Sequence, residues 1–147
     1  MSALDVFRVV RPYGTFFAIV GTYGISALLH GLNLQLAAVL LSLGFYTYTE
    51  HVTRQKLASI FSACIQARKC GPNCGHQWKA NHWAIMTCNF CFSLLAVFHL
   101  AYLGLMFDSS KLQEEGYSLS HALKKWRWLN YSSHWIVFAT FAFNCLI

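Results

Sequence analysis

The stretch PYGTFFAIVGTYGISALLHGLNLQLAAVLLSLGFYTYT, residues 12–49, decides the fold class because it contains no Asp, Glu, Lys or Arg. Two further uncharged blocks follow, at 80–107 and 128–147. Each block reaches or exceeds the roughly 20 residues that a helix needs to cross a hydrocarbon core of ~30 Å. Only 11% of the chain is charged, whereas a soluble domain uses about a quarter. The sequence therefore predicts an integral membrane protein.

The number of spans follows from the length of these blocks. A single helix over residues 12–49 would be about 57 Å long, almost twice the hydrocarbon thickness. We therefore predict two spans, at about 13–29 and 32–49, with a break near His30; one long, tilted helix is the alternative. With further spans at about 83–107 and 128–147, the expected fold is all-α with about four transmembrane helices.

Residues 51–68 are predicted to form an amphipathic helix, lying in the membrane interface or packed on the protein's own helices. Apolar residues recur there at helical spacing, and the other face is polar, with Arg54, Gln55, Ser59, Ser62 and Gln66. The bias of basic residues places the 50–82 loop on the cytosolic side. The net charge of +6 is spread over membrane-flanking positions, so it requires no nucleic-acid partner.

The segment Cys70-Gly-Pro-Asn-Cys74-Gly-His76 offers three soft metal ligands within one short turn. A zinc site there would take Cys64 or His82 as its fourth ligand. A Cys70–Cys74 disulfide would need an oxidising compartment, and cysteines beside a membrane are also acylated. The spacing is not one of the paired zinc signatures, so we favour a Gly-Pro turn with free thiols and no bound metal.

His30 is the candidate catalytic residue, because it is ionisable and lies in the longest uncharged run. The polar residues Tyr23, Ser26, His30 and Asn33 are three, four and three residues apart, so one helix would place them on one face. A break at Gly31 would remove Asn33 from that face. An ionisable residue inside a membrane is a functional candidate by default, and a buried, neutral imidazole is suited to accept a proton. The alternative is a histidine that bonds a carbonyl and joins two helices.

Two more histidines lie in the predicted spans. His99 is a second candidate, which we expect to act in packing or as a polar bridge. His134 lies near the start of the last predicted span, and we expect it at the depth of the membrane interface.

Several stretches, in the same order along the chain, resemble the membrane-bound O-acyltransferase family. They are SALLHG (26–31), LNLQLAAVLLSLGFYTYTEHV (32–52), LASIFSAC (57–64), the Cys-x-x-x-Cys loop, FHLAYLG-x-x-FD (98–108), EEGY (114–117) and SHW (133–135). Within the family, the resemblance is to the member that attaches palmitoleate to a serine of Wnt proteins in the endoplasmic reticulum.

The resemblance implies that His30 is the catalytic base. It would deprotonate the acceptor serine of a Wnt protein for attack on the thioester of palmitoleoyl-CoA. No cofactor is implied, and the expected location is a multi-pass position in the endoplasmic reticulum membrane, within the lipid bilayer. On geometry, Tyr23, Ser26 and Asn33 would line the substrate tunnel.

The resemblance covers only the C-terminal part of the family's multi-helix fold. Family members are several times longer and carry a second catalytic polar residue, commonly an asparagine, upstream of the histidine. We therefore expect residues 1–147 to be a fragment that is inactive alone. The alternatives are part of a transporter, in which His30 relays protons, and a scaffold with a metal-bound cysteine loop.

Overall fold

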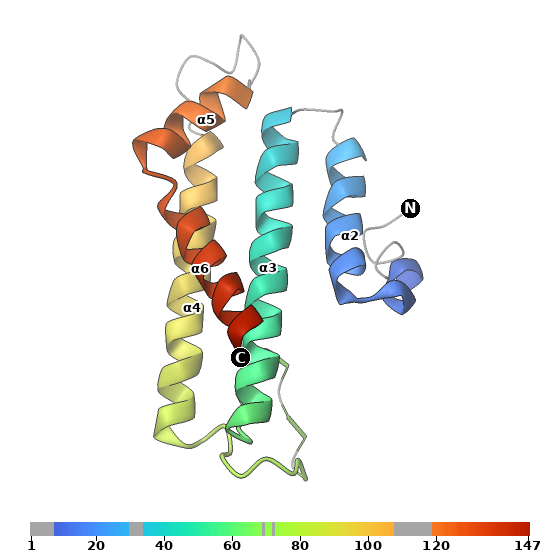
Figure 1. The fold of residues 1–147 in the computed structure, drawn as a ribbon, viewed down its shortest axis with the longest axis vertical. Helices are drawn as coiled ribbons and strands as arrows, with labels where there is room; N and C mark the ends of the chain where they lie inside the picture. The colour runs from blue at the N-terminus through green and yellow to red at the C-terminus, as the bar shows by residue number, and fades with distance from the viewer. Residues whose placement is uncertain (1–7, 30–33, 69, 72, 108–118) are drawn as a thin grey trace.

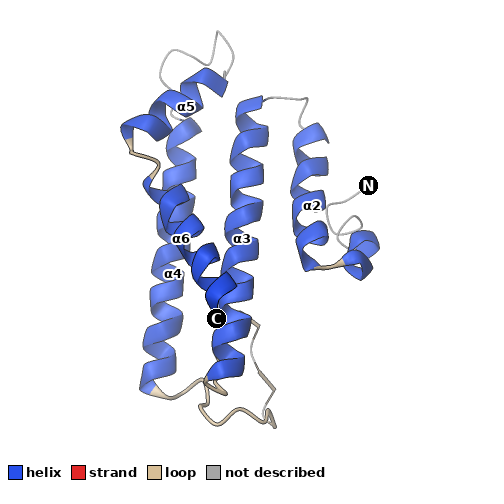
Figure 2. Ribbon diagram, in the orientation of Figure 1, coloured by secondary structure: helices blue, strands red, loops and turns tan. Residues whose placement is uncertain are grey.

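The described part of the chain is all-helical, as the sequence predicts (Figures 1 and 2). The computed structural model describes residues 8–29, 34–68, 70–71, 73–107 and 119–147. Its helices are η1 (Arg11–Tyr13), α2 (Thr15–Leu29), α3 (Leu34–Ile60), α4 (Trp83–Gly104), η2 (Leu105–Phe107), α5 (Leu119–Trp128) and α6 (Ser132–Leu146). Within the described residues, extended pairing is limited to a single bridge between Ala63 and Trp78.

Helix α3 is the centre of the bundle, because it contacts α2, α4, α5 and α6. Figure 1 shows α2 on one side of α3, with α4 and α6 on the other. A Cβ added to Gly44 of α3 would lie 2.9 Å from Cδ2 of Tyr23 on α2. That distance is too short for a carbon–carbon contact, so the close approach of α2 to α3 depends on the glycine.

Among the described residues, one helical segment is long and apolar enough to cross a membrane, Trp83–Phe107 with mean hydropathy 2.0. Helix α2 is apolar but shorter, so the predicted count of four spans is not confirmed. Large apolar side chains along α4 are exposed, including Trp83, Met86, Phe90, Leu94 and Val97. Their spacing of three or four residues places them on one helical face.

The structure corrects the predicted amphipathic helix over 51–68. Residues 51–60 continue α3 without a break, and the chain leaves the helix near Ser62, which has a φ of 48°. Arg54, expected on the polar face, is only 8% exposed. Its guanidinium donates to Glu50 Oε1 at 2.7 Å, to the carbonyl of Ile65 at 2.8 Å and to Asn89 Oδ1 at 2.9 Å. These partners satisfy the buried charge, so this part of α3 packs against its neighbours.

The helix predicted as the last span, 128–147, begins later in the structure, at Ser132. Asn130 and Tyr131 have φ angles of 51° and 50°, and these left-handed residues separate α5 from α6. The buried residues of α5, Ala122 and Trp126, are four positions apart and join the main core. The helix that follows begins only at Ser132.

Candidate active-site region

Two buried polar residues meet where α4 packs against α6. Nδ1 of His99 lies 2.6 Å from Oγ of Ser133, and the two residues are 7% and 0% exposed. The ring of Tyr46, on α3, lies 4.7 Å from the His99 ring, centroid to centroid. Buried polar atoms need partners in an apolar bundle, and this pairing makes His99 the polar bridge that the sequence predicts.

The second histidine of this region, His134, has a partner at each ring nitrogen. Nε2 lies 3.4 Å from Ser42 Oγ, and Nδ1 lies 3.2 Å from the hydroxyl of Tyr102. The ring of Trp126 meets it edge-on at 4.7 Å. His134 therefore lies half-buried among α3, α4 and α5, and its contacts fix the orientation of the imidazole.

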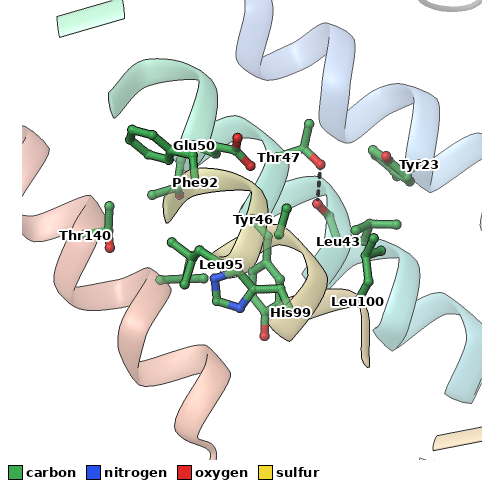
Figure 3. A pocket seen from close by; sticks show the side chains of 13 residues that line it. Tyr23, Leu43, Tyr46, Thr47, Glu50, Phe92, Leu95, His99, Leu100 and Thr140 are labelled. Atoms are coloured by element: carbon green, nitrogen blue, oxygen red, sulfur yellow. Dashed lines mark hydrogen bonds between the residues drawn. The ribbon is translucent and has the colours of Figure 1, made fainter. Parts of the chain in front are cut away.

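A cavity of about 280 Å³ lies beside this polar pair, between side chains of α2, α3, α4 and α6 (Figure 3). Its polar lining includes Tyr46, Glu50, His99 and Thr140, and Tyr23 lines it from α2. The remaining lining residues are mostly apolar. Such a cavity can hold an apolar chain with a few polar groups placed against it.

The predicted catalytic residues fall partly outside what the structure describes. His30 and Asn33 lie in the 30–33 connection between α2 and α3, which is outside the described residues. Helix α2 ends at Leu29, immediately before His30. Of the other two predicted lining residues, Tyr23 borders the cavity, whereas Ser26 is half-buried on α2 and is not among its lining residues.

The loop between α3 and α4 gathers four soft ligands at the opposite end of α3. The ligand atoms of Cys64, Cys70, Cys74 and His76 all lie within 4.8 Å of one another. His82 does not take part, because its Nδ1 accepts from the backbone N–H of Ala84 and caps α4. The six described cysteines of the chain are free thiols.

The thiols of this group have opposite pKa shifts. Burial, followed by the neighbouring thiols of Cys70 and Cys74, raises the pKa of Cys64 to about 11. Hydrogen bonding with His76, and then with Cys64, lowers the pKa of Cys74 to about 6. The ammonium of Lys79 lies 3.4 Å from Cys74 Sγ and also favours its thiolate.

Two buried amides were not predicted from the sequence, and the charge of Arg54 was not predicted to be buried. Nε2 of Gln35 donates to the carbonyl of Met106 at 2.6 Å, and Nδ2 of Asn144 donates to Thr53 Oγ1 at 2.8 Å. A lone amide in an apolar helix was the available signal for these two. For Arg54, the signal was its spacing of four residues from Glu50, which is typical of a helical ion pair.

Comparison with known proteins finds a single kind of relative. No protein-family model matches the chain. Among curated proteins, it is 46% identical to the human protein-serine O-palmitoleoyltransferase porcupine over 145 residues, which are 97% of this chain and 31% of that protein. The porcupines of Anopheles gambiae and Drosophila melanogaster are 41% and 36% identical, over 97% and 88% of this chain and 29% and 26% of their own lengths. The chain thus spans about a third of the relatives it matches.

Proposed function

Because this chain is homologous to a C-terminal part of the porcupine enzymes, we propose that it forms part of a protein-serine O-palmitoleoyltransferase. The observation that carries this proposal is the 46% identity to the human enzyme over 97% of the chain. A transporter fragment or a non-catalytic scaffold would not account for that identity.

The proposed reaction moves a palmitoleoyl group from its coenzyme A thioester to a serine hydroxyl of a Wnt protein. His30 takes the serine proton as the oxygen attacks the thioester carbonyl. The tetrahedral intermediate then collapses, the carbon–sulfur bond breaks, and the coenzyme A thiolate leaves and takes the proton from His30. A histidine base in such a step typically contributes about 10²–10⁴-fold to the rate.

The location of His30 supports this role. It directly follows α2 in the sequence, and the fifteen residues of that helix contain no charge. Tyr23, Ser26 and Asn33 are proposed to line the path of the substrate from the same segment. The cavity bordered by Tyr23 and His99 supports a substrate path along α2.

We further propose a multi-pass location in the endoplasmic reticulum membrane. Helix α4 supports insertion in a membrane, because Trp83–Phe107 is long and apolar enough to span the bilayer, and the other uncharged blocks of the sequence would supply the further spans. Its row of exposed apolar side chains would face lipid or the rest of the enzyme.

The experiment tests this chain within a full-length enzyme, because the relatives are about three times longer. The chain is grafted in place of the matching part of a porcupine enzyme, and palmitoleoyl transfer to a Wnt peptide is measured. His30→Ala is expected to lower the rate about 10²–10⁴-fold. His51→Ala, in the half-exposed part of α3, is the matched control and should retain activity.

Retained transfer in the His30→Ala graft would contradict the assignment of the base. A graft that folds and inserts but transfers no acyl group, with His30 intact, would contradict the acyltransferase proposal itself. Size-exclusion profiles and palmitoleoyl-CoA binding of each variant separate loss of chemistry from loss of folding.

A further inference from the structure

The four ligand atoms of the loop between α3 and α4 have the spacing of a tetrahedral metal site. Cys64 Sγ lies 3.5 Å from Cys74 Sγ, and Nδ1 of His76 lies 3.6 Å from Cys64 Sγ and 3.5 Å from Cys70 Sγ. With Zn–S bonds of about 2.3 Å and a Zn–N bond of about 2.0–2.1 Å, tetrahedral zinc places neighbouring sulfurs about 3.8 Å apart and sulfur and nitrogen about 3.6 Å apart. The observed distances fit one central ion.

From this geometry we propose that Cys64, Cys70, Cys74 and His76 bind one structural zinc ion. Four protein ligands fill a tetrahedral shell and leave no open position, which is the arrangement of structural rather than catalytic zinc. The site lies outside the cavity bordered by Tyr23 and His99. The proposal does not depend on acyl transfer.

The charges around the site favour a bound cation. A buried thiol such as Cys64 is costly to ionise alone, whereas a divalent ion supplies the compensating charge. Three thiolates and one zinc ion carry one net negative charge, and the Lys79 ammonium, 3.4 Å from Cys74 Sγ, offsets it. A lysine at this place is expected beside a thiolate-rich zinc centre.

A disulfide explains the cluster less well. It would join two of the three sulfurs and leave the third thiol and His76 without a reason to converge. A turn with free thiols would be held by S–H donors, which are weak. Gly71, Asn73 and Gly75 are exposed, so the buried apolar cluster that holds Ala63 and Ile65 at the start of the loop does not include the turn between Cys70 and His76.

The proposed ion would join α3 to α4. The N–H of Cys64 donates to the carbonyl of Trp78 at 2.9 Å, and the N–H of Trp78 donates to the carbonyl of Ser62 at 3.1 Å. This short pairing brings the two ends of the loop together, and Arg54 donates to the carbonyl of Ile65 next to it. Zinc would close the segment between them and fix where α4 begins.

The test measures metal content of the full chain, produced in zinc-containing medium and purified in detergent without chelators. We expect about one zinc ion per chain in the wild type. Cys70→Ser and His76→Ala should each lose most of it. Cys145→Ser, at an exposed free thiol outside the cluster, is the matched control and should retain it.

Substoichiometric zinc in the wild type, or equal zinc in all four proteins, would overturn the proposal. Because a cysteine variant can also fail to fold, a second measurement uses the wild type alone. Replacing zinc by Co²⁺ should give the intense visible bands and thiolate charge transfer of a tetrahedral site rich in sulfur. The weak spectrum of an octahedral, oxygen-ligated ion would equally overturn it.

Discussion

The two ends of α3 carry the two candidate sites of this chain, and different observations reveal them. At its N-terminal end, the motif SALLHG points to His30 by sequence, while residues 30–33 lie outside the described structure. At its C-terminal end, the spacing of the cysteines along the sequence is not a paired zinc signature. The fold nevertheless brings together four ligands, of which the first and last, Cys64 and His76, are twelve residues apart. Figure 1 shows the α3–α4 loop at the far end of α3 from α2's last turn.

The two kinds of site are encoded differently in the chain. A general base needs one imidazole in the right surroundings, so a short motif can carry it. A metal centre needs several donors at fixed distances, and these depend on the path of the backbone. If the two ends are independent, a change at one end should leave the other intact.

Removing the metal should have the largest effect, confined to the C-terminal end of α3. Structural zinc contributes on the order of 10 kcal/mol to the segments it orders, so chelation should raise amide exchange at Cys64 and Trp78 by about a hundredfold or more. Hydrogen–deuterium exchange of the full chain measures this. Amides of α2 are the internal control, and an equal loss of protection there would contradict the independence of the two ends of α3.

Arg54→Met should have the next largest effect. The substitution removes the donors to Glu50, Ile65 and Asn89, and leaves their oxygens without these partners. We expect a loss of about 2–4 kcal/mol in the free energy of unfolding, because breaking a buried ion pair leaves polar groups uncompensated. Denaturant unfolding in detergent measures it.

The matched control for this substitution is Arg127→Met, at an exposed position of α5. It should change stability by less than about 0.5 kcal/mol. A similar loss in both variants would show that general charge effects, rather than the contacts of Arg54, hold this end of α3.

Gly44→Ala tests the other side of the comparison, the contact between α2 and α3. The new Cβ would lie 2.9 Å from the Tyr23 ring, and overpacking of this kind costs about 1–3 kcal/mol. The gain of alanine over glycine in a helix, about 1 kcal/mol, offsets part of that. We expect a net loss of up to about 2 kcal/mol in thermal unfolding experiments.

Gly24→Ala provides the control, because a Cβ there meets no atom within 4 Å. It should leave stability unchanged or raise it by up to about 1 kcal/mol. If Gly44→Ala also stabilises the chain, this would contradict the short distance between position 44 of α3 and the Tyr23 ring of α2.

Ser133→Ala should have the smallest effect of the four and probes the core between the two ends. It removes the 2.6 Å contact with His99, and a buried hydrogen bond of this kind is worth about 1 kcal/mol. Ser93→Ala is the control, because this exposed hydroxyl donates to the Asn89 carbonyl within α4. A loss as large in Ser93→Ala would assign the effect to removal of a helical serine hydroxyl in general rather than to the His99 contact.

Much of the helical architecture follows from the sequence, because long uncharged runs have few ways to satisfy their backbone. Helix α2 ends at Leu29, α3 begins at Leu34 and α4 begins at Trp83, each within a few residues of the bounds predicted for the spans. The bounds predicted for a separate helix over 51–68 were wrong, because residues 51–60 continue α3. The contacts of Arg54 agree with the packed alternative, which helical spacing alone could not choose, since spacing shows that a face is polar but not whether a neighbour covers it. Arg54 was expected to face solvent, but the fold places Asn89 and the Ile65 carbonyl beside it.

The all-helical class, the apolar segment Trp83–Phe107 and the motif around His30 can be recognised in the sequence alone, because each of these is a local property of consecutive residues. Folding of the chain is needed to show that Cys64 rather than His82 completes the cysteine–histidine cluster, and that His99 meets Ser133. Those pairings join residues far apart in the chain, and their distances depend on how the helices pack. Packing is set by the fit of many side chains at once, which no single stretch of sequence contains.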